Sequence, residues 1–240
     1  KTPEICFLKA MGDSSASAAK PADFRRYWGG LIWSVGQDLG LDTVTTATAA
    51  LYFQRFFVAE LEGEFDAHRV AISCVWLASK VRESGCRQRD IINSFEIFTG
   101  RMDDEKGMPM EAYWALRDEV ILHEQAVLRA MAFDAELTPA YAFLTEFAWM
   151  IGGSSSDSGV LSLAWTLLND SFCSDACVMS SPDRVALGCL ILAVEICRKV
   201  QQLNSQAERL SRRLDQLLRE PRLEDFLGLG KGSDEIEDVC

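Results

Sequence analysis

The hydrophobic pattern of the chain is organised around residues 68–83, which read HRVAISCVWLASKVRE. The apolar side chains of this run leave no polar face, so a helix here would be enclosed by other helices. The run is too short to cross a bilayer, which takes about 20 apolar residues. A near copy, DRVALGCLILA, follows at 183–193, and only the first copy continues into Ser79-Lys80. The repeat predicts two similar helical units, each built around an enclosed helix.

Apolar residues at helical spacing predict helices along most of the chain. The predicted helices cover about 22–40, 42–61, 68–83, 91–98, 110–131, 138–151, 160–172, 182–198 and 203–217. Asp42 or Thr43 would cap the second helix, and Thr138-Pro139 would start the sixth. Strand-like alternation between hairpin turns is absent from the sequence. The pattern therefore predicts an all-α fold.

The order of these helices predicts two tandem units with flanking segments. We expect an N-terminal extension over 1–21, a first unit over 22–135, a second unit over 138–228 and an acidic tail over 229–240. Little sequence lies between residues 198 and 203 for a fourth helix, so the second unit is expected to be abbreviated.

Composition narrows the choice of partners. The 240 residues carry a net charge of −12, and an acidic surface repels phosphate backbones, so we expect no direct nucleic-acid partner. Neither a signal-peptide pattern nor a transmembrane run is visible, so we expect no membrane partner. The eight cysteines form no CxxC pair and the chain has two histidines, which favours a reducing compartment and neither a metal site nor a cofactor.

Signatures of catalysis are also missing from the sequence. It contains no phosphate-binding glycine loop, and the acidic run 103–105 falls in a polar loop expected to be solvated. His68 is expected to be half exposed at a helix start, and His123 to lie on the surface side of its helix. Neither histidine has a nucleophile or acid at triad spacing, so we expect no catalytic residue and no enzymatic activity.

Two charged residues stand out from this pattern. Glu124 falls on the apolar stripe of its helix with Val120 and Leu128, where an unpaired carboxylate would be costly. Lys80 ends the enclosed helix. Lys80 is either simply a lysine favourably placed at a helix C-terminus, or it pairs with Glu124 at the mouth of a surface where the backbone of a partner docks.

Several spaced motifs resemble, in their order, the cyclin box. They are ALYFQRF at 50–56, LASKVRE at 77–83, RDII at 89–92 and the segment from Glu119 through Glu124 to Phe133. The resemblance covers about 22–197 and is strongest to the transcription-type cyclins, the cyclin L, K, T and Q group, through RDIIN at 89–93, YWALRD at 113–118 and AWTLLNDSF at 164–172. It implies two tandem five-helix cyclin-box domains, the second abbreviated.

The resemblance also implies a function. In that family the first box binds a cyclin-dependent kinase and holds it in its active conformation without contributing a catalytic group. The resemblance therefore implies a heterodimer with such a kinase, acting in the nucleus on transcription or RNA processing. By this match the kinase-facing residues are Lys80, Val81, Glu83, Glu124, Leu128 and Phe133.

The chain departs from the family pattern at three places. Gln54 replaces the aspartate that cell-cycle cyclins pair with an arginine, here Arg25; Arg82 replaces a glutamate; and FRRYW at 24–28 replaces a substrate-docking patch. These aromatic residues would form a different groove or pack against the second box. Two alternatives remain: a double-box general transcription factor that binds DNA, which the net charge disfavours, and a peptide-binding scaffold without a kinase.

Overall fold

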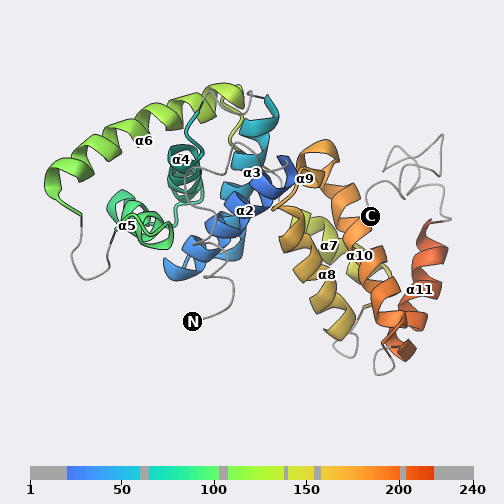
Figure 1. The fold of residues 1–240 in the computed structure, drawn as a ribbon. Helices are drawn as coiled ribbons and strands as arrows, with labels where there is room; N and C mark the ends of the chain where they lie inside the picture. The colour runs from blue at the N-terminus through green and yellow to red at the C-terminus, as the bar shows by residue number, and fades with distance from the viewer. Residues whose placement is uncertain are drawn as a thin grey trace. The chain divides into compact units, whose positions relative to one another are not determined.

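The computed structural model describes residues 21–59, 65–102, 108–137, 140–153, 158–200 and 204–218. Every regular element in these ranges is a helix, which confirms the predicted all-α class (Figure 1). The predicted N-terminal extension up to residue 20, the acidic run 103–105, the Thr138-Pro139 helix start and the acidic tail lie outside the described residues.

The chain divides into two compact units that interleave in sequence. One unit comprises Lys1–Leu137 together with Phe172–Val178, and the other comprises Thr138–Ser171 together with Met179–Cys240. No sequence pattern had indicated that the short segment 172–178 belongs with the first unit.

The first unit is built around the enclosed helix that the hydrophobic pattern predicted. Its helices are α2 (Pro21–Asp38), α3 (Thr43–Ala59), α4 (Ala67–Val81), α5 (Gln88–Phe98) and α6 (Met110–Ala130). Helix α4 packs against the other four, and Figure 1 shows it between α5 and α6. Its side chains from Val70 to Val75 are at most 1% exposed. Burial of such apolar side chains is the main force that holds the helices together.

Side-chain caps explain where α3 and α4 begin. The Asp42 carboxylate accepts a hydrogen bond of 2.9 Å from the Thr45 backbone N–H, so Asp42, one of the two predicted candidates, caps α3. Asp66 caps α4 in the same way through the His68 N–H at 2.9 Å. Each cap pairs a backbone donor that the first helical turn would leave unsatisfied.

The segment 172–178 is fastened to the first unit by close backbone contacts. The Gln54 amide nitrogen donates to the Phe172 carbonyl oxygen at 3.2 Å, and the Gln54 side chain is fully buried. Gly29 of α2 lies so close to Cys173 that an added Cβ would be 2.9 Å from the Cys173 Cα. Gln54 therefore anchors this segment, and only glycine allows its backbone to approach α2 this closely.

The packing of the first unit involves two of the aromatic residues 24–28 and also His68. Phe24 and Trp28 lie in an aromatic cluster of their own unit, with ring centroids each 6.2 Å from that of Phe53. The exposure expected for His68 is wrong. His68 is 1% exposed rather than half exposed. It tolerates burial because its Nδ1 lies 3.0 Å from Arg101 Nη1 and its Nε2 3.4 Å from a Glu96 carboxylate oxygen. The sequence pattern missed these partners because they come from distant positions.

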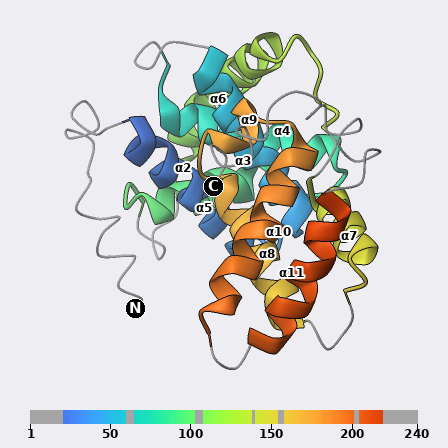
Figure 2. The same ribbon diagram turned by 90° about the vertical axis from the view of Figure 1, so that its right-hand side faces the viewer.

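The second unit repeats the central-helix arrangement with fewer helices. It contains α7 (Ala140–Met150), α8 (Ser158–Ser171), α10 (Pro182–Arg198) and α11 (Asn204–Leu218). Helix α10 packs against the other three and is seen beside α8 and α11 in Figure 2. The short helix α9 (Ala176–Met179), of which all but Met179 belongs to the first unit, was not predicted, because four residues are too few to show a hydrophobic period.

Candidate functional site

The candidate site lies on the first unit, where α4 and α6 are joined by an ion pair. The Lys80 ammonium in the last turn of α4 contacts a carboxylate oxygen of Glu124 on α6. The Glu124 side chain is 11% exposed and the Lys80 side chain 42%. Lys80 also lies over the Trp76 ring, 5.2 Å from its centroid, a favourable cation–π distance. The structure thus forms the Lys80–Glu124 pair that the sequence left as one of two interpretations.

Both helices of the site end in the same backbone motif. At the end of α4 the Ser84 N–H bonds to the Ser79 carbonyl at 3.0 Å, and at the end of α6 the Phe133 N–H bonds to the Leu128 carbonyl at 2.8 Å. This Schellman motif requires a residue in the left-handed conformation, where glycine is usual. Glu83, with φ 53°, takes that position after α4, and Ala132, with φ 52°, takes it after α6.

Other helices of the chain end in the same motif with glycine. Gly40 after α2, Gly100 after α5 and Gly152 after α7 have φ values of 64°, 72° and 63°. Phe133 is also left-handed, with φ 62°. Among the described residues, non-glycine positive φ angles therefore occur only at the ends of α4 and α6. Each such residue costs about 1–2 kcal/mol, and such strain tends to gather at functional sites.

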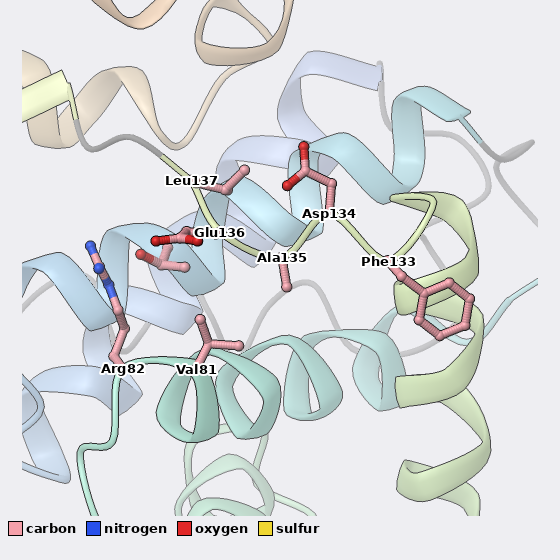
Figure 3. A pocket seen from close by; sticks show the side chains of 8 residues that line it. Val81, Arg82, Phe133, Asp134, Ala135, Glu136 and Leu137 are labelled. Atoms are coloured by element: carbon pink, nitrogen blue, oxygen red, sulfur yellow. The ribbon is translucent and has the colours of Figure 1, made fainter.

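The ends of α4 and α6 border a cavity of about 560 Å³, shown in Figure 3. It is lined by Thr48, Val81, Arg82, Phe133, Asp134, Ala135, Glu136 and Leu137. Phe133 is 69% exposed and Val81 37%. Exposed apolar groups beside a concavity are typical of surfaces that bind other proteins.

The segment that forms one wall of the cavity is held by the core behind it. The Tyr52 hydroxyl donates a hydrogen bond of 2.5 Å to the Ala135 carbonyl. Burial raises the pKa of Tyr52 to about 12, so the hydroxyl keeps its proton and remains a donor at neutral pH. The Asp134 N–H also bonds to the Met131 carbonyl at 3.0 Å.

The residues predicted from the sequence occupy different parts of this surface. Val81 and Phe133 line the cavity, while Lys80 and Glu124 form the ion pair. Glu83 lies in the exposed turn after α4, and Leu128 is partly buried on α6 and does not line the cavity.

The predicted site residues did not include Tyr52 or the other residues that line the cavity. These are Thr48, Asp134, Ala135, Glu136, Leu137 and Arg82, of which only Arg82 had been noted, as a departure from the family pattern. A signal for Thr48 and Tyr52 was available in the buried face of α3, but residues 134–137 follow a helix end and carry no periodic pattern.

Other chemistry is limited in the part of the chain that the structure describes. No group of three or more His, Cys, Asp or Glu side chains there could hold a metal ion. None of the described helices has the length and apolarity needed to span a bilayer. Burial raises the pKa of the Cys74 thiol well above its usual range and that of Cys177 to about 12. These thiols therefore pack as small apolar groups.

Comparison with known proteins relates this architecture to one family. The family model for the cyclin N-terminal domain matches residues 8–136. Human Cyclin-K is 28% identical over 195 residues, covering 78% of this chain and 32% of that protein. Cyclin pch1 of Schizosaccharomyces pombe is 32% identical over 165 residues, covering 68% of this chain and 48% of that protein. The chain thus spans less than half the length of these relatives.

Solved structures show the same fold at low sequence identity. A chain in the crystal structure of the yeast RNA Pol II CTD kinase CTDK-1 complex matches 81% of this chain and 61% of its own length, with a TM-score of 0.64 and 16% identity. A chain of the yeast TFIIK (Kin28/Ccl1/Tfb3) complex matches 90% of this chain and 92% of its own length, with a TM-score of 0.57 and 17% identity. Because the family model covers more than half of the sequence, the chain belongs to the cyclin family.

Proposed function

We propose that this cyclin is the regulatory subunit of a cyclin-dependent protein kinase that acts in transcription or RNA processing. The observation that carries the proposal is the Lys80–Glu124 pair beside the exposed Val81 and Phe133. A family model of the cyclin N-terminal domain and relatives named Cyclin-K and Cyclin pch1 support it. A chain of similar fold belongs to the yeast RNA Pol II CTD kinase CTDK-1 complex, and this supports a nuclear role.

The proposed mechanism is allosteric and non-catalytic. The residues that we assign to the kinase-facing surface are Lys80, Val81, Glu83, Glu124, Leu128 and Phe133. Lys80 and Glu124 present opposite charges to backbone groups around the regulatory helix of the kinase, and the apolar side chains bury against that helix. A partner that binds one conformer better than another shifts the kinase toward that conformer by its differential affinity. The chain itself supplies no group that reacts.

The test begins with identification of the kinase and then removes the ion pair. Mass spectrometry of proteins that co-purify with the tagged chain identifies the kinase, which is then used in purified form. Lys80→Glu or Glu124→Lys places two like charges side by side where the pair stood, and should weaken kinase binding by about 2–5 kcal/mol. This corresponds to a roughly 30- to several-thousand-fold rise in Kd.

Two further variants separate a loss of contact from a loss of folding. Arg69→Glu breaks the other α4–α6 ion pair, in which Arg69 Nε lies 2.7 Å from a Glu119 carboxylate oxygen; it should leave kinase binding within a few fold. The double exchange Lys80→Glu with Glu124→Lys restores the internal pair but reverses its polarity, so binding should stay weak. Unchanged affinity in both single variants, with far-UV circular dichroism intact, contradicts the proposed interface.

A further inference from the structure

The cavity at the ends of α4 and α6 carries its charges on two separate walls. Arg82, the residue that caps α4, lies on one wall, and Asp134 and Glu136 lie on the facing segment. Figure 3 shows Arg82 and Val81 rising from the end of α4 toward that segment, with Ala135 between the two acidic residues. The cavity therefore has a cationic wall, an anionic wall and a short apolar strip between them.

Arg82 differs from the two cations of α4, Arg69 and Lys80, because it forms no ion pair, although its charge acts on the Asp42 carboxylate from a distance. Arg69 pairs with Asp66 and Glu119, and Lys80 pairs with Glu124. The Arg82 guanidinium is half-buried, yet it forms no hydrogen bond or ion pair with any residue that the structure describes. A guanidinium offers five donors in a planar fork that matches a carboxylate, and here that fork lines a cavity with its donors available.

The two acidic residues are also available, and their backbone is held in place. Asp134 and Glu136 are exposed, and their carboxylates form no hydrogen bond or ion pair within the described residues. The segment that carries them is tied to the core through the Tyr52–Ala135 hydrogen bond. A partner that uses this wall would not have to order the backbone first, so little of the binding energy is lost to ordering.

We propose that this cavity selects a partner segment of alternating charge. The segment presents a carboxylate to Arg82, a basic side chain to Asp134 and Glu136, and an apolar side chain to Val81. This inference rests on the proposed function, since the segment belongs to the kinase, and it adds the chemistry by which one kinase is preferred to another. A segment with the opposite order of charges places like charges together on both walls and is rejected.

The volume and chemistry of the cavity fit such a segment better than a single ion. About 560 Å³ lies within the range of about 300–1,000 Å³ that is usual for binding sites of molecules much larger than one side chain. Charge-assisted hydrogen bonds between guanidinium and carboxylate are about twice as strong as neutral ones. The cavity thus has room for several side chains and uses charge to set their order.

A displayed peptide library tests the charge order without a known kinase. Helix-forming peptides with a fixed central isoleucine and Asp, Lys, Ser or Ala at the flanking positions are selected on the complete, immobilised chain. The wild-type chain should enrich peptides with one acidic and one basic flank, in one order, by roughly tenfold over the reversed order. Arg82→Gln should abolish the acidic preference, and Arg82→Glu should replace it with a basic one.

Matched variants show which wall of the cavity is responsible for each charge preference. Asp134→Lys with Glu136→Lys should remove the basic preference and leave the acidic one. Arg26→Glu makes the same charge change as Arg82→Glu at an exposed position of α2 outside the cavity, so it should select like the wild type. The best peptide and its charge-reversed partner are then measured by fluorescence anisotropy, with thermal unfolding of each variant to confirm that it is folded.

The outcomes separate this inference from the proposed function. Absence of any enriched charge order, or an order that Arg82→Gln leaves unchanged in a folded variant, overturns the inference. If Lys80→Glu still abolishes kinase binding in that case, the proposed function stands. If both pair variants bind the kinase normally while the peptide selection follows Arg82, the cavity binds charged segments but the kinase interface is wrong.

Discussion

The central helices of the two units, α4 and α10, keep the same interior and differ at their C-terminal ends. Val70 and Ala71 of α4 match Val185 and Ala186 of α10, and all four are buried. Lys80 of α4 pairs across to Glu124 on another helix, whereas the corresponding Glu195 of α10 pairs with Arg198 on the same helix at 2.9 Å. The buried side chains shared by α4 and α10 build the same packing in both units, while the C-terminal ends of the two helices differ in their ion pairs.

The surroundings of the two helices also differ. Leu77 of α4 is 4% exposed, while its counterpart Leu192 of α10 is only partly buried. An ion pair to a nearly buried carboxylate fixes the position of both helices, since neither charge can be lost cheaply. A pair between two half-exposed side chains one turn apart contributes only about 0.2–0.5 kcal/mol. The ion pair at the end of α4 therefore joins that helix to α6, whereas the pair at the end of α10 stays within its own helix.

The largest predicted effect tests the difference in enclosure. Leu77→Ala should lower the free energy of unfolding by about 2–5 kcal/mol, because it opens a cavity in a packed interior. Leu192→Ala should cost clearly less, about 1–2 kcal/mol, because water already reaches that side chain. Urea unfolding of the two variants gives the comparison, and equal losses would show that α10 is as enclosed as α4.

The next effect tests the two ion pairs. Lys80→Met should lower the free energy of unfolding by about 1–2 kcal/mol, because it leaves the Glu124 carboxylate without its partner while the Lys80 end of the pair is partly solvated. Glu195→Gln should change it by less than about 0.5 kcal/mol. Denaturant titration at low and high salt measures both, and an effect of Glu195→Gln as large as that of Lys80→Met would remove the proposed distinction.

A third effect compares one buried tyrosine in each unit. Tyr52→Phe removes the hydrogen bond to Ala135 and should cost about 1 kcal/mol, and Tyr141→Phe removes a bond of 2.6 Å to Asn169 with a similar loss. Burial raises the pKa of Tyr52 to about 12, so the unfolded chain releases this proton first. The contribution of Tyr52 to the free energy of unfolding is complete below about pH 10 and is lost as the pH rises toward 12.

Thermal unfolding at neutral pH and near pH 11 tests whether the folded chain loses stability as the pH rises past 10. The wild-type chain should lose stability over that interval more steeply than the Tyr52→Phe variant. An equal slope would mean that the Tyr52 hydroxyl is not protected in the folded chain.

The smallest effect concerns the ends of the helices. Ala132→Gly should raise the free energy of unfolding by about 0.5 kcal/mol, because relief of the left-handed strain slightly exceeds the added chain entropy of glycine. Gly40→Ala is the matched reverse change, since an added Cβ there meets nothing within 4 Å, and it should cost about 1 kcal/mol. Calorimetry resolves both. Destabilisation by Ala132→Gly would show that α6 ends without strain.

The sequence predicts features that depend on local periodicity. The enclosed helix 68–83, the helical class and the position of Glu124 on an apolar stripe all follow from spacing alone. Spacing left the Lys80–Glu124 pair as one of two interpretations of Lys80, and the resemblance to the cyclin box favoured it. The burial of His68 could not be predicted, because its partners Glu96 and Arg101 come from the end of another helix.

The cavity could not be predicted for a related reason. It depends on how α4 and α6 end, and both ends lack the glycine that usually marks a left-handed position. The charged wall at Asp134 and Glu136 is placed by Tyr52, about 80 residues earlier in the chain. A pattern within a single helix contains no information about such a contact.

The anchoring of residues 172–178 by Gln54 affects how the protein is made. A ribosome that has released residues up to 137 has supplied five helices of the first unit but not the segment that completes it. Roughly 40 more residues must be added, which takes several seconds at about 5–20 residues per second. During vectorial synthesis the face of α2 and α3 around Gly29 and Gln54 therefore stays open, and chaperones that recognise nascent chains have that interval in which to bind it.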